Sequence, residues 1–331
     1  MTIDWNAATE AVDAAQTILV VTHIKPDGDA IGSLVGLANA LRERGKLVDA
    51  AVDGGVPLPF LFLPGADLVK PSLNAGDWDL MISVDASDEE RIGLAGQHGM
   101  VHSKKVINLD HHPTNTGFGD VALVAPEAVS ATEVIFNWLH DMGHPISPEV
   151  AVPLLTGLVT DTIGFRTSNV VPATMAVAQQ LMEAGASLAD IVQRTLVRKP
   201  YSTIALWRES LQSVVLRDSV ISATITRADL KKAHLPDVTD SGLVGLLIAV
   251  EEASIAVVFK EMADGRIEIS LRSKPGFDVS QVAYSLGGGG HRQASGATID
   301  GPLEAAQARV MPLLQAAVKE GLPLVGLPER Q

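Results

Sequence analysis

The stretch Thr17-Ile-Leu-Val-Val-Thr-His-Ile-Lys-Pro-Asp-Gly-Asp29 joins an apolar, β-branched run to a polar loop with three potential metal ligands, His23, Asp27 and Asp29. The run Thr17–Thr22 predicts a strand, and the residues from Ile31 to Arg44 predict a helix after the loop. In an open parallel sheet, ligands bind at the carboxyl ends of the strands, which is where this loop falls. A plain polar turn, with Asp29 near a helix N-terminus, explains this one stretch equally well.

The rest of the first half repeats this alternation of short apolar runs with helical stretches. Such alternation is typical of a parallel sheet covered by helices. Leu154–Val159 is apolar and fits either type of element, although the end of a helix is favoured. The further strands that we expect are Val48–Val52, Leu80–Val84 and Lys105–Leu109, and the further helix is Ala131–Met142.

The pattern changes in the second half, where β-rich runs begin at Ser213. We therefore expect an α/β fold class with two domains. Residues 1–186 form a domain with a parallel sheet flanked by helices, residues 187–212 a helical linker, and residues 213–331 a smaller α/β domain with a mixed sheet. The strands expected in the second domain are Val220–Thr226, Ile255–Lys260 and Arg266–Arg272, and the Pro- and Gly-rich tail after Gly321 is expected to be loosely held.

Composition excludes several classes of site and partner. The 331 residues contain no cysteine, so any metal must be held by oxygen and imidazole ligands. Neither a signal peptide nor an apolar run long enough to span a bilayer is evident, which favours a cytoplasmic protein with no membrane partner. The net charge of −14 argues against binding long duplex nucleic acid but not against binding a short nucleotide.

The negative charge is concentrated in the first domain. Residues 1–212 carry 13 Lys and Arg against 25 Asp and Glu, whereas residues 213–331 carry 12 against 14. An acidic surface is the plain explanation for this excess. Two divalent cations bound in the first domain would offset four of these charges.

Two further strands end in potential metal ligands. Asp85 follows Val84, and Asp110, His111 and His112 follow Leu109. Carboxylates at the same end of three strands of one sheet lie close together, and they would raise one another's pKa unless cations lay between them. Asp161, after Thr156-Gly-Leu-Val-Thr160, taken alone fits a helix cap or a surface acid. Mixed carboxylate and imidazole ligands favour Mn²⁺, with Mg²⁺ or Co²⁺ as substitutes.

A pair of such ions points to the hydrolysis of phosphoester or phosphoanhydride bonds. In two-metal sites one carboxylate bridges the ions, a hydroxide formed between them attacks phosphorus, and both ions neutralise the charge that develops.

Gly287-Gly-Gly-Gly290-His291 is a second potential site, in the C-terminal domain. Consecutive glycines allow a backbone to approach a ligand and expose its N–H groups to it. Upstream, Arg272 and Ser273 end an expected strand and add cationic and hydroxyl groups. A flexible linker is the alternative for the glycines, and a salt bridge is an ordinary role for Arg272. A binding site is favoured here, with Arg272, Ser273, Gly288, Gly289, Gly290 and His291 as its residues.

Four segments together resemble the motifs of the DHH phosphoesterase superfamily, in the same order. These are Thr22-HIKPDGDAIGS-33, Val84-DASDEERIG-93, Leu109-DHHPTNTGFGD-120 and Thr156-GLVTDTIGF-165. The resemblance implies that His23 and Asp27 hold one metal, that Asp29, His111 and Asp161 hold the other, and that Asp85 bridges them. It also implies that Asp110 orients the site and that His112 faces the phosphate as a donor.

The LRS segment and the GGGGH segment resemble the DHHA1 domain, in which the arginine and the glycine loop engage a nucleotide. The arrangement and length are similar to the NrnA type, which acts on short oligoribonucleotides and as a pAp phosphatase. A cyclic or linear dinucleotide phosphodiesterase has the same two domains and is the alternative. A nucleotide-binding protein without activity is a third hypothesis, and a homodimer is compatible with all three.

The chain departs from the family pattern at two places. Ile163 stands where family members commonly have Gly directly after the Asp-Thr of the fourth motif, and QASG follows GGGGHR where AAG is frequent. The implied metal ligands are unchanged. The departures therefore concern the shape of the substrate site.

Overall fold

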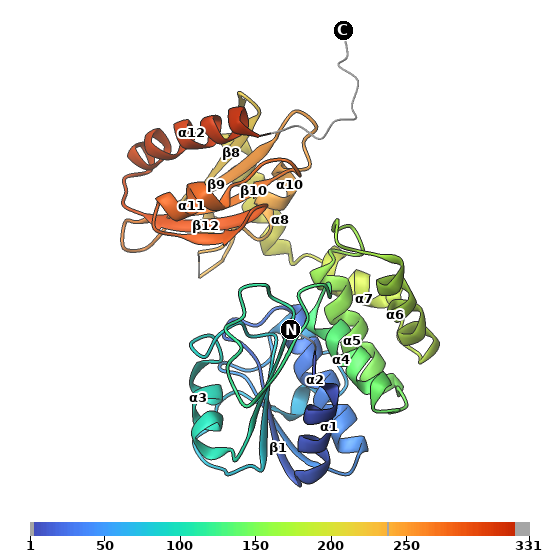
Figure 1. Ribbon diagram of the computed structural model, residues 1–331. Coiled ribbons are helices and arrows are strands. Elements are labelled where there is room, and N and C mark those ends of the chain that lie inside the picture. The colour runs from blue at the N-terminus through green and yellow to red at the C-terminus, as the bar shows by residue number, and fades with distance from the viewer. Residues whose placement is uncertain (1–2, 237, 322–331) are drawn as a thin grey trace. The chain divides into compact units, whose positions relative to one another are not determined.

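The computed structural model describes residues 3–236 and 238–321, and the chain forms two compact units (Figure 1). Unit 1 is Met1–Arg198 and unit 2 is Lys199–Gln331. The boundary lies inside the helical segment 187–212 that we expected as a linker. The tail after Gly321 lies outside the described residues. Within the described part, no helix is both long and apolar enough to cross a membrane.

Unit 1 is built on a six-stranded, wholly parallel sheet in the order β3-β2-β1-β4-β5-β6. The four strands predicted from apolar runs are confirmed, each to within a residue or so. The chain adds two short edge strands that the sequence analysis did not identify. The strands are β1 (Thr17–Val21), β2 (Leu47–Ala51), β3 (Val69–Lys70), β4 (Leu80–Val84), β5 (Val106–Asp110) and β6 (Val121–Val124).

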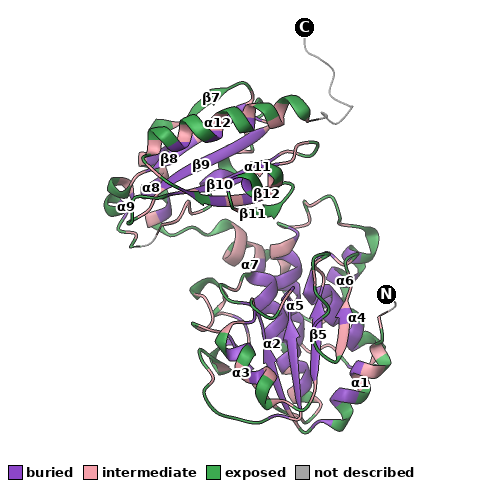
Figure 2. Ribbon diagram, turned by 60° about the vertical axis from the view of Figure 1, so that its left-hand side comes forward, coloured by how far each residue is buried: buried purple, intermediate pink, exposed green. Residues whose placement is uncertain are grey.

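Helices cover both faces of this sheet. Ile18 and Val20 of β1 pack with the larger group of helices, whereas Leu19 and Val21 face the opposite layer that contains α3. Figure 2 shows the strands between these layers, of which β4 and β5 are buried along their whole length. The helices are α1 (Trp5–Ala14), α2 (Gly28–Glu43), α3 (Gly93–His102), α4 (Ala131–Asp141), α5 (Pro148–Asp161), α6 (Pro172–Glu183) and α7 (Leu188–Val192), with short 3₁₀ turns at Leu58–Phe60 and Ala66–Leu68 and a π turn at Gln193–Val197.

The helices α2 and α5 run antiparallel in unusually close contact. A Cβ at Gly32 would lie 2.6 Å from the carbonyl oxygen of Pro153, and one at Gly157 would lie 2.6 Å from Oδ1 of Asp29. Glycine is therefore required at Gly32 for the two backbones to approach this closely, and at Gly157 for the side chains of Asp29 and Thr132 to fit against α5. The contact brings the C-terminal end of α5 beside the N-terminal end of α2. Leu154–Val159 lies in α5, as favoured from the sequence.

Unit 2 contains a mixed sheet in the order β11-β12-β10-β9-β8-β7, in which only β8 and β9 pair in parallel. One face packs against α11 and α12, and the other packs against α8, α9 and α10. The α/β fold class is confirmed for both domains. The elements are α8 (Tyr201–Ser210), β7 (Val215–Arg217), β8 (Val220–Ile225), α9 (Arg227–Lys232), α10 (Leu243–Leu247), β9 (Ile255–Glu261), β10 (Ile267–Ser273), α11 (Ser280–Ser285), β11 (Gly289–His291), β12 (Ala294–Ile299) and α12 (Leu303–Glu320), with a 3₁₀ turn at Leu211–Ser213.

Candidate functional site

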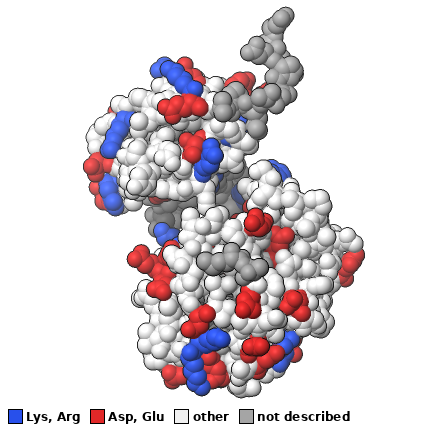
Figure 3. All heavy atoms as spheres, viewed as in Figure 1, with Lys and Arg blue, Asp and Glu red and all other residues white. Residues whose placement is uncertain are grey.

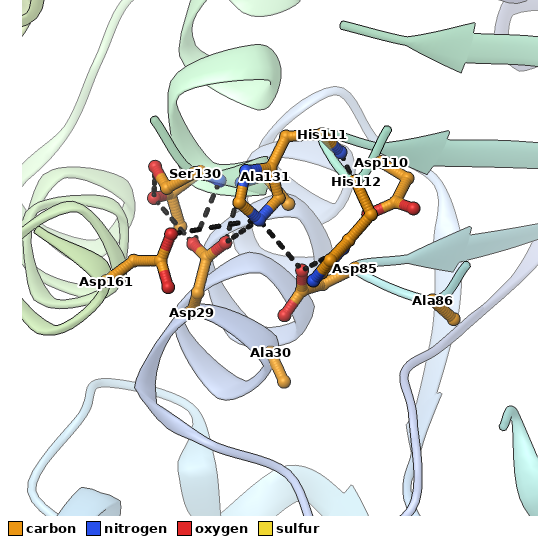
Figure 4. Close-up of polar contacts among 12 residues, drawn as sticks. Asp29, Ala30, Asp85, Ala86, Asp110, His111, His112, Ser130, Ala131 and Asp161 are labelled. Carbon is orange, nitrogen blue, oxygen red and sulfur yellow. Dashed lines mark hydrogen bonds and ion pairs between the residues drawn. The ribbon is translucent and has the colours of Figure 1, made fainter. Parts of the chain in front are cut away.

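Three neighbouring strands of unit 1 end in the acidic and histidine loops. β1, β4 and β5 are adjacent in the sheet and parallel, so their carboxyl ends meet at one edge. His23 follows β1, Asp85 follows β4, and Asp110 is the last residue of β5. Figure 4 shows the resulting cluster, in which His111 lies between Asp29 and Asp161 on one side and Asp85 on the other. The topology thus brings together residues that lie far apart in the sequence.

The first turn of α2 positions two carboxylates. The Asp27 side chain caps the helix by accepting hydrogen bonds from the backbone N–H groups of Asp29 and Ala30. Asp29 is buried and accepts from the backbone N–H of Ala131, at 2.6 Å, and from the hydroxyl of Thr132, at 2.8 Å. The N-terminus of α4 therefore fixes Asp29 and stabilises its negative charge. No local sequence pattern indicates this contact, because Ala131 is 102 residues distant from Asp29 and acts through its backbone.

Asp85 lies at the centre of the cluster. It adopts the left-handed conformation, with φ +56°, and it is buried. His23 Nε2 lies 3.5 Å from its Oδ2, and His111 Nε2 lies 3.6 Å from its Oδ1. That Oδ1 accepts no hydrogen bond within the described chain. A buried carboxylate oxygen without a donor carries a large desolvation cost, which a bound cation would offset.

Three groups of potential ligands share this edge of the sheet, and one of them is Asp85, Asp110, His111 and His112. The other two match the sets that the family resemblance implies. In each set, one ligand atom from every residue lies within 4.8 Å of the others. The first set is His23, Asp27 and Asp85, and the second is Asp29, His111 and Asp161. Asp85 faces both sets, since its second oxygen is directed to His111 of the other one. The residues present thus fit two divalent cations with Asp85 between them.

The electrostatics of the carboxylates fit the same interpretation. Burial, reinforced by the charge of Asp27, raises the pKa of Asp29 to about 7. Burial and the charge of Asp29 raise the pKa of Asp161 to about 7. The pKa of Asp85 lies well above its ordinary value, because of burial and of the charges of Asp29 and Asp27. Cations between these groups would offset their repulsion.

The two histidines of the ligand sets are suited to binding a metal as neutral imidazoles. Burial lowers the pKa of His23 and the pKa of His111. The Nδ1 atom of His23 lies 2.9 Å from the carbonyl oxygen of Ile24. Donation from Nδ1 to this carbonyl leaves the lone pair on Nε2, the atom that faces Asp85.

Asp110 and His112 form a hydrogen-bonded pair within the group that also contains Asp85 and His111. Asp110 accepts from His112 Nδ1 at 2.8 Å, from the backbone N–H of His111 at 2.8 Å and from Asn115 Nδ2 at 2.6 Å. Burial alone would raise the pKa of Asp110, but these hydrogen bonds outweigh burial and lower it. The hydrogen bond to Asp110 is in turn the main cause that raises the pKa of His112. Asn115 was missed from the sequence, although it follows the histidines within the third motif.

The fourth motif continues from α5 into strained backbone. Ile163, two residues after Asp161, has φ +51°, a left-handed conformation that is costly for a β-branched residue. Gly164 after it also has a positive φ. The position where the family commonly has Gly is thus one at which glycine avoids strain. The departure at Ile163 changes the side chain that is presented there and leaves Asp161 among the potential ligands.

The predicted binding residues of unit 2 differ in what they contact. The Ser273 hydroxyl is buried and donates to the carbonyl oxygens of Phe277 and Arg292, so it holds the end of β10. A Cβ at Gly288 would collide with the backbone of β12, whereas a Cβ at Gly289 would meet no atom within 4 Å. The glycine segment is partly an edge strand, β11, rather than a loop throughout. Gly289, Gly290 and His291 are exposed, and Arg272 is half-buried.

Acidic side chains are spread over the face of unit 1 that Figure 3 shows, and basic ones there are few. The excess of acidic residues that the sequence gives the first domain is visible on this face.

Comparison with known proteins agrees with these observations. The model of the DHH family, N-terminal domain, matches residues 17–158, and the DHHA1 domain model matches residues 219–320. The chain is similar to a protein of Thermus thermophilus named bifunctional oligoribonuclease and PAP phosphatase NrnA, with 33% identity over 93% of this chain and 91% of the relative.

Two solved structures are also similar. An exopolyphosphatase-related protein from Bacteroides fragilis has 25% identity and a TM-score of 0.87, over 96% of this chain and 97% of that one. RecJ from Thermus thermophilus, solved in complex with Mn²⁺, shares the fold at 16% identity and a TM-score of 0.53, over 96% of this chain and 54% of RecJ.

Proposed function

The chain belongs to the DHH family and is a relative of the NrnA-type proteins over nearly its whole length, and on this premise we propose that it hydrolyses short oligoribonucleotides and the 3′-phosphate of pAp. The reaction class is phosphoester hydrolysis. The proposal includes two divalent ions, with Mn²⁺ favoured over Mg²⁺ or Co²⁺. It also includes the cytoplasmic location expected from the sequence and allows a homodimer.

The observation that carries the proposal is the pair of ligand sets that share Asp85. His23 and Asp27 would hold one ion, and Asp29, His111 and Asp161 the other. Two ions in these positions would supply an activated water molecule and would neutralise charge on the phosphoryl oxygens during in-line displacement. The carboxylates themselves are positioned by strand ends and by the N-terminus of α4, so the site is preorganised before substrate binds.

His112 is proposed to act on the substrate rather than on a metal. Asp110 holds its Nδ1 at 2.8 Å and raises its pKa, which favours the cationic form with a proton on Nε2. A cationic donor at this position would stabilise the negative charge on a phosphoryl oxygen in the transition state. Asn115, which also donates to Asp110, would keep this carboxylate and hence the His112 ring in place.

The second unit is proposed to select short substrates. Arg272 is half-buried, and Gly289, Gly290 and His291 present exposed backbone and imidazole at the edge of the sheet. Backbone N–H groups and a guanidinium recognise phosphate or the edge of a base. Anchoring one end of a nucleotide there would align the scissile bond at the ions and limit the length of substrate that is cut well.

A substrate panel tests the proposal. Purified protein with Mn²⁺ is incubated with pAp, with RNAs from dinucleotides upward, and with cyclic dinucleotides. We expect cleavage of pAp and of the shortest RNAs, with a decline in kcat/KM as the RNA lengthens. Preference for cyclic or linear dinucleotides alone would favour the phosphodiesterase alternative. Binding of these nucleotides without any metal-dependent turnover, on bis-p-nitrophenyl phosphate as well, would favour a binding protein.

A further inference from the structure

The loop after β4 holds the backbone of Arg91 beside the metal-ligand loop. The carboxylate of Asp88 accepts from the backbone N–H of Arg91 at 2.9 Å. The backbone N–H of Ile24 donates to the carbonyl oxygen of Arg91 at 2.8 Å. Ile24 directly follows His23, so these two hydrogen bonds hold the backbone of Arg91 next to a potential metal ligand.

The guanidinium of Arg91 forms neither a hydrogen bond nor an ion pair with any residue that the structure describes, although its loop contains three acidic residues and the site five more. Three other arginines in residues 3–236 and 238–321 lack such contacts, and all three lie exposed at the surface: Arg198, Arg217 and Arg309. Arg91 alone among these four is half-buried. A half-buried cation without a counter-ion keeps its donors available for an anion from outside the chain.

The charge of Arg91 acts on the residues of the site. Burial is the main cause that lowers the pKa of His23, and the charge of Arg91 lowers that pKa further. The pKa of His112 is raised chiefly by its hydrogen bond to Asp110, and Arg91 opposes this increase. The guanidinium is therefore close enough to His23 and His112 for its charge to act on both.

We propose that Arg91 is a substrate-binding residue that donates to a non-bridging oxygen of the phosphoryl group undergoing hydrolysis, in addition to the donor supplied by His112. This inference rests on the proposed function. A guanidinium binds phosphate oxygens through two parallel N–H groups, which a histidine cannot do. A monoester carries close to two negative charges at neutral pH, whereas a diester carries one. Arg91 therefore contributes more to hydrolysis of pAp than to hydrolysis of a dinucleotide.

The experiment compares Arg91→Ala and Arg91→Lys with Arg44→Ala as a matched control. Arg44 pairs with Asp13 and directly follows α2, at the opposite end of this helix from the site. We expect Arg91→Ala to lower kcat/KM on pAp on the order of a hundredfold, with a smaller loss on a dinucleotide and an intermediate loss for Arg91→Lys. Added guanidinium chloride should restore part of the activity of Arg91→Ala, and Mn²⁺ content and melting temperature should stay unchanged.

Inorganic phosphate provides a readout that needs no turnover. Titration of the Mn²⁺-loaded protein with phosphate, followed by calorimetry, should show weaker binding to Arg91→Ala than to wild type or to Arg44→Ala. If wild type cleaves nothing in the substrate panel, the proposed function fails while this titration still decides the role of Arg91. If wild type cleaves pAp and Arg91→Ala stays within about twofold of it, or loses Mn²⁺ in proportion to activity, the inference about Arg91 is wrong.

Discussion

The two units differ in the secondary-structure elements that carry their potential functional residues. In unit 1 several of the side chains stand at the ends of central, buried strands, and Asp29 and Asp110 are each held by hydrogen bonds from neighbouring groups. In unit 2 the glycine strand β11 is at the edge of its sheet and exposed. A site for charge stabilisation gains from rigidity, whereas a site that accepts nucleotides of different lengths needs accessible backbone. Substitutions in unit 1 should therefore impair metal binding or catalysis on every substrate, whereas substitutions in unit 2 should impair the binding of nucleotides.

The largest effect is expected from Asp85→Ala. This change removes the carboxylate that faces both ligand sets, so both cations should bind weakly. We expect a loss of activity of roughly a thousandfold or more on every substrate, since metal ions stabilise the transition state by several kcal/mol. Metal content by inductively coupled plasma mass spectrometry should fall in parallel. Near-normal turnover with two ions still bound would show that Asp85 is not a shared ligand.

His112→Ala should separate catalysis from metal binding within unit 1. By analogy with removing one transition-state donor, kcat should fall on the order of a hundredfold while Mn²⁺ occupancy remains. Steady-state kinetics and metal analysis on the same preparation provide the measurement. Asn115→Ala should give a smaller loss in the same direction, because it acts on His112 only through Asp110. Loss of an ion from His112→Ala would place His112 among the ligands instead.

Adjacent glycines of unit 2 make a matched pair. Gly289→Val has open space for its side chain and should fold normally, yet it should lower kcat/KM on pAp and dinucleotides about tenfold or more through misplaced substrate. Hydrolysis of bis-p-nitrophenyl phosphate, which needs only the ions, should be largely spared.

Gly288→Val, in contrast, must displace β12 and should lower the melting temperature.

Arg272→Ala should lower kcat/KM on pAp and dinucleotides in the same way as Gly289→Val. Equal losses on both substrates for Gly289→Val and Arg272→Ala would mean that unit 2 does not select substrate.

The smallest effect is a pH dependence of stability in the metal-free protein. Asp29 and Asp161 titrate at about 7 in the folded chain, against an ordinary value of 3.8. Because these pKa values are raised by folding, their contribution to stability is fully present below the ordinary value. It is lost as the pH rises to about 7. Mn²⁺ should therefore raise the melting temperature more at neutral than at acidic pH.

Thermal melts of chelator-treated protein across this range test the sign of the effect. Asp161→Asn serves as the control, since its melting temperature should fall less steeply with pH than that of wild type. An equal slope for the two proteins would contradict the raised pKa of Asp161.

The sequence predicted the central strands well, because buried parallel strands are continuous apolar runs. It did not reveal β6, which is short, or β11, whose glycines have low strand propensity. Strand-end residues such as Asp85 and Asp110 could be placed from topology alone. Asp161 could not, because it ends a helix, and only the family resemblance related it to the others.

Some features of the site depend on tertiary contacts that no local pattern encodes. The α4 N–H groups that hold Asp29 belong to this class, as does the unpaired guanidinium of Arg91. Local sequence patterns depend on residues that are adjacent in the chain, whereas these features depend on residues that folding brings together.

The glycine contact between α2 and α5 acts as a spacer that sets the dimensions of the site. Asp29 is near the start of one helix and Asp161 at the end of the other, so their separation depends on how closely the two backbones approach. Gly32 allows that approach, and Gly157 leaves room for the Asp29 carboxylate itself. The span available to a cation is thus determined about one helical turn away from Asp29 and Asp161, which would bind it. A single methyl group at Gly32 would widen the site while leaving every ligand in the sequence intact.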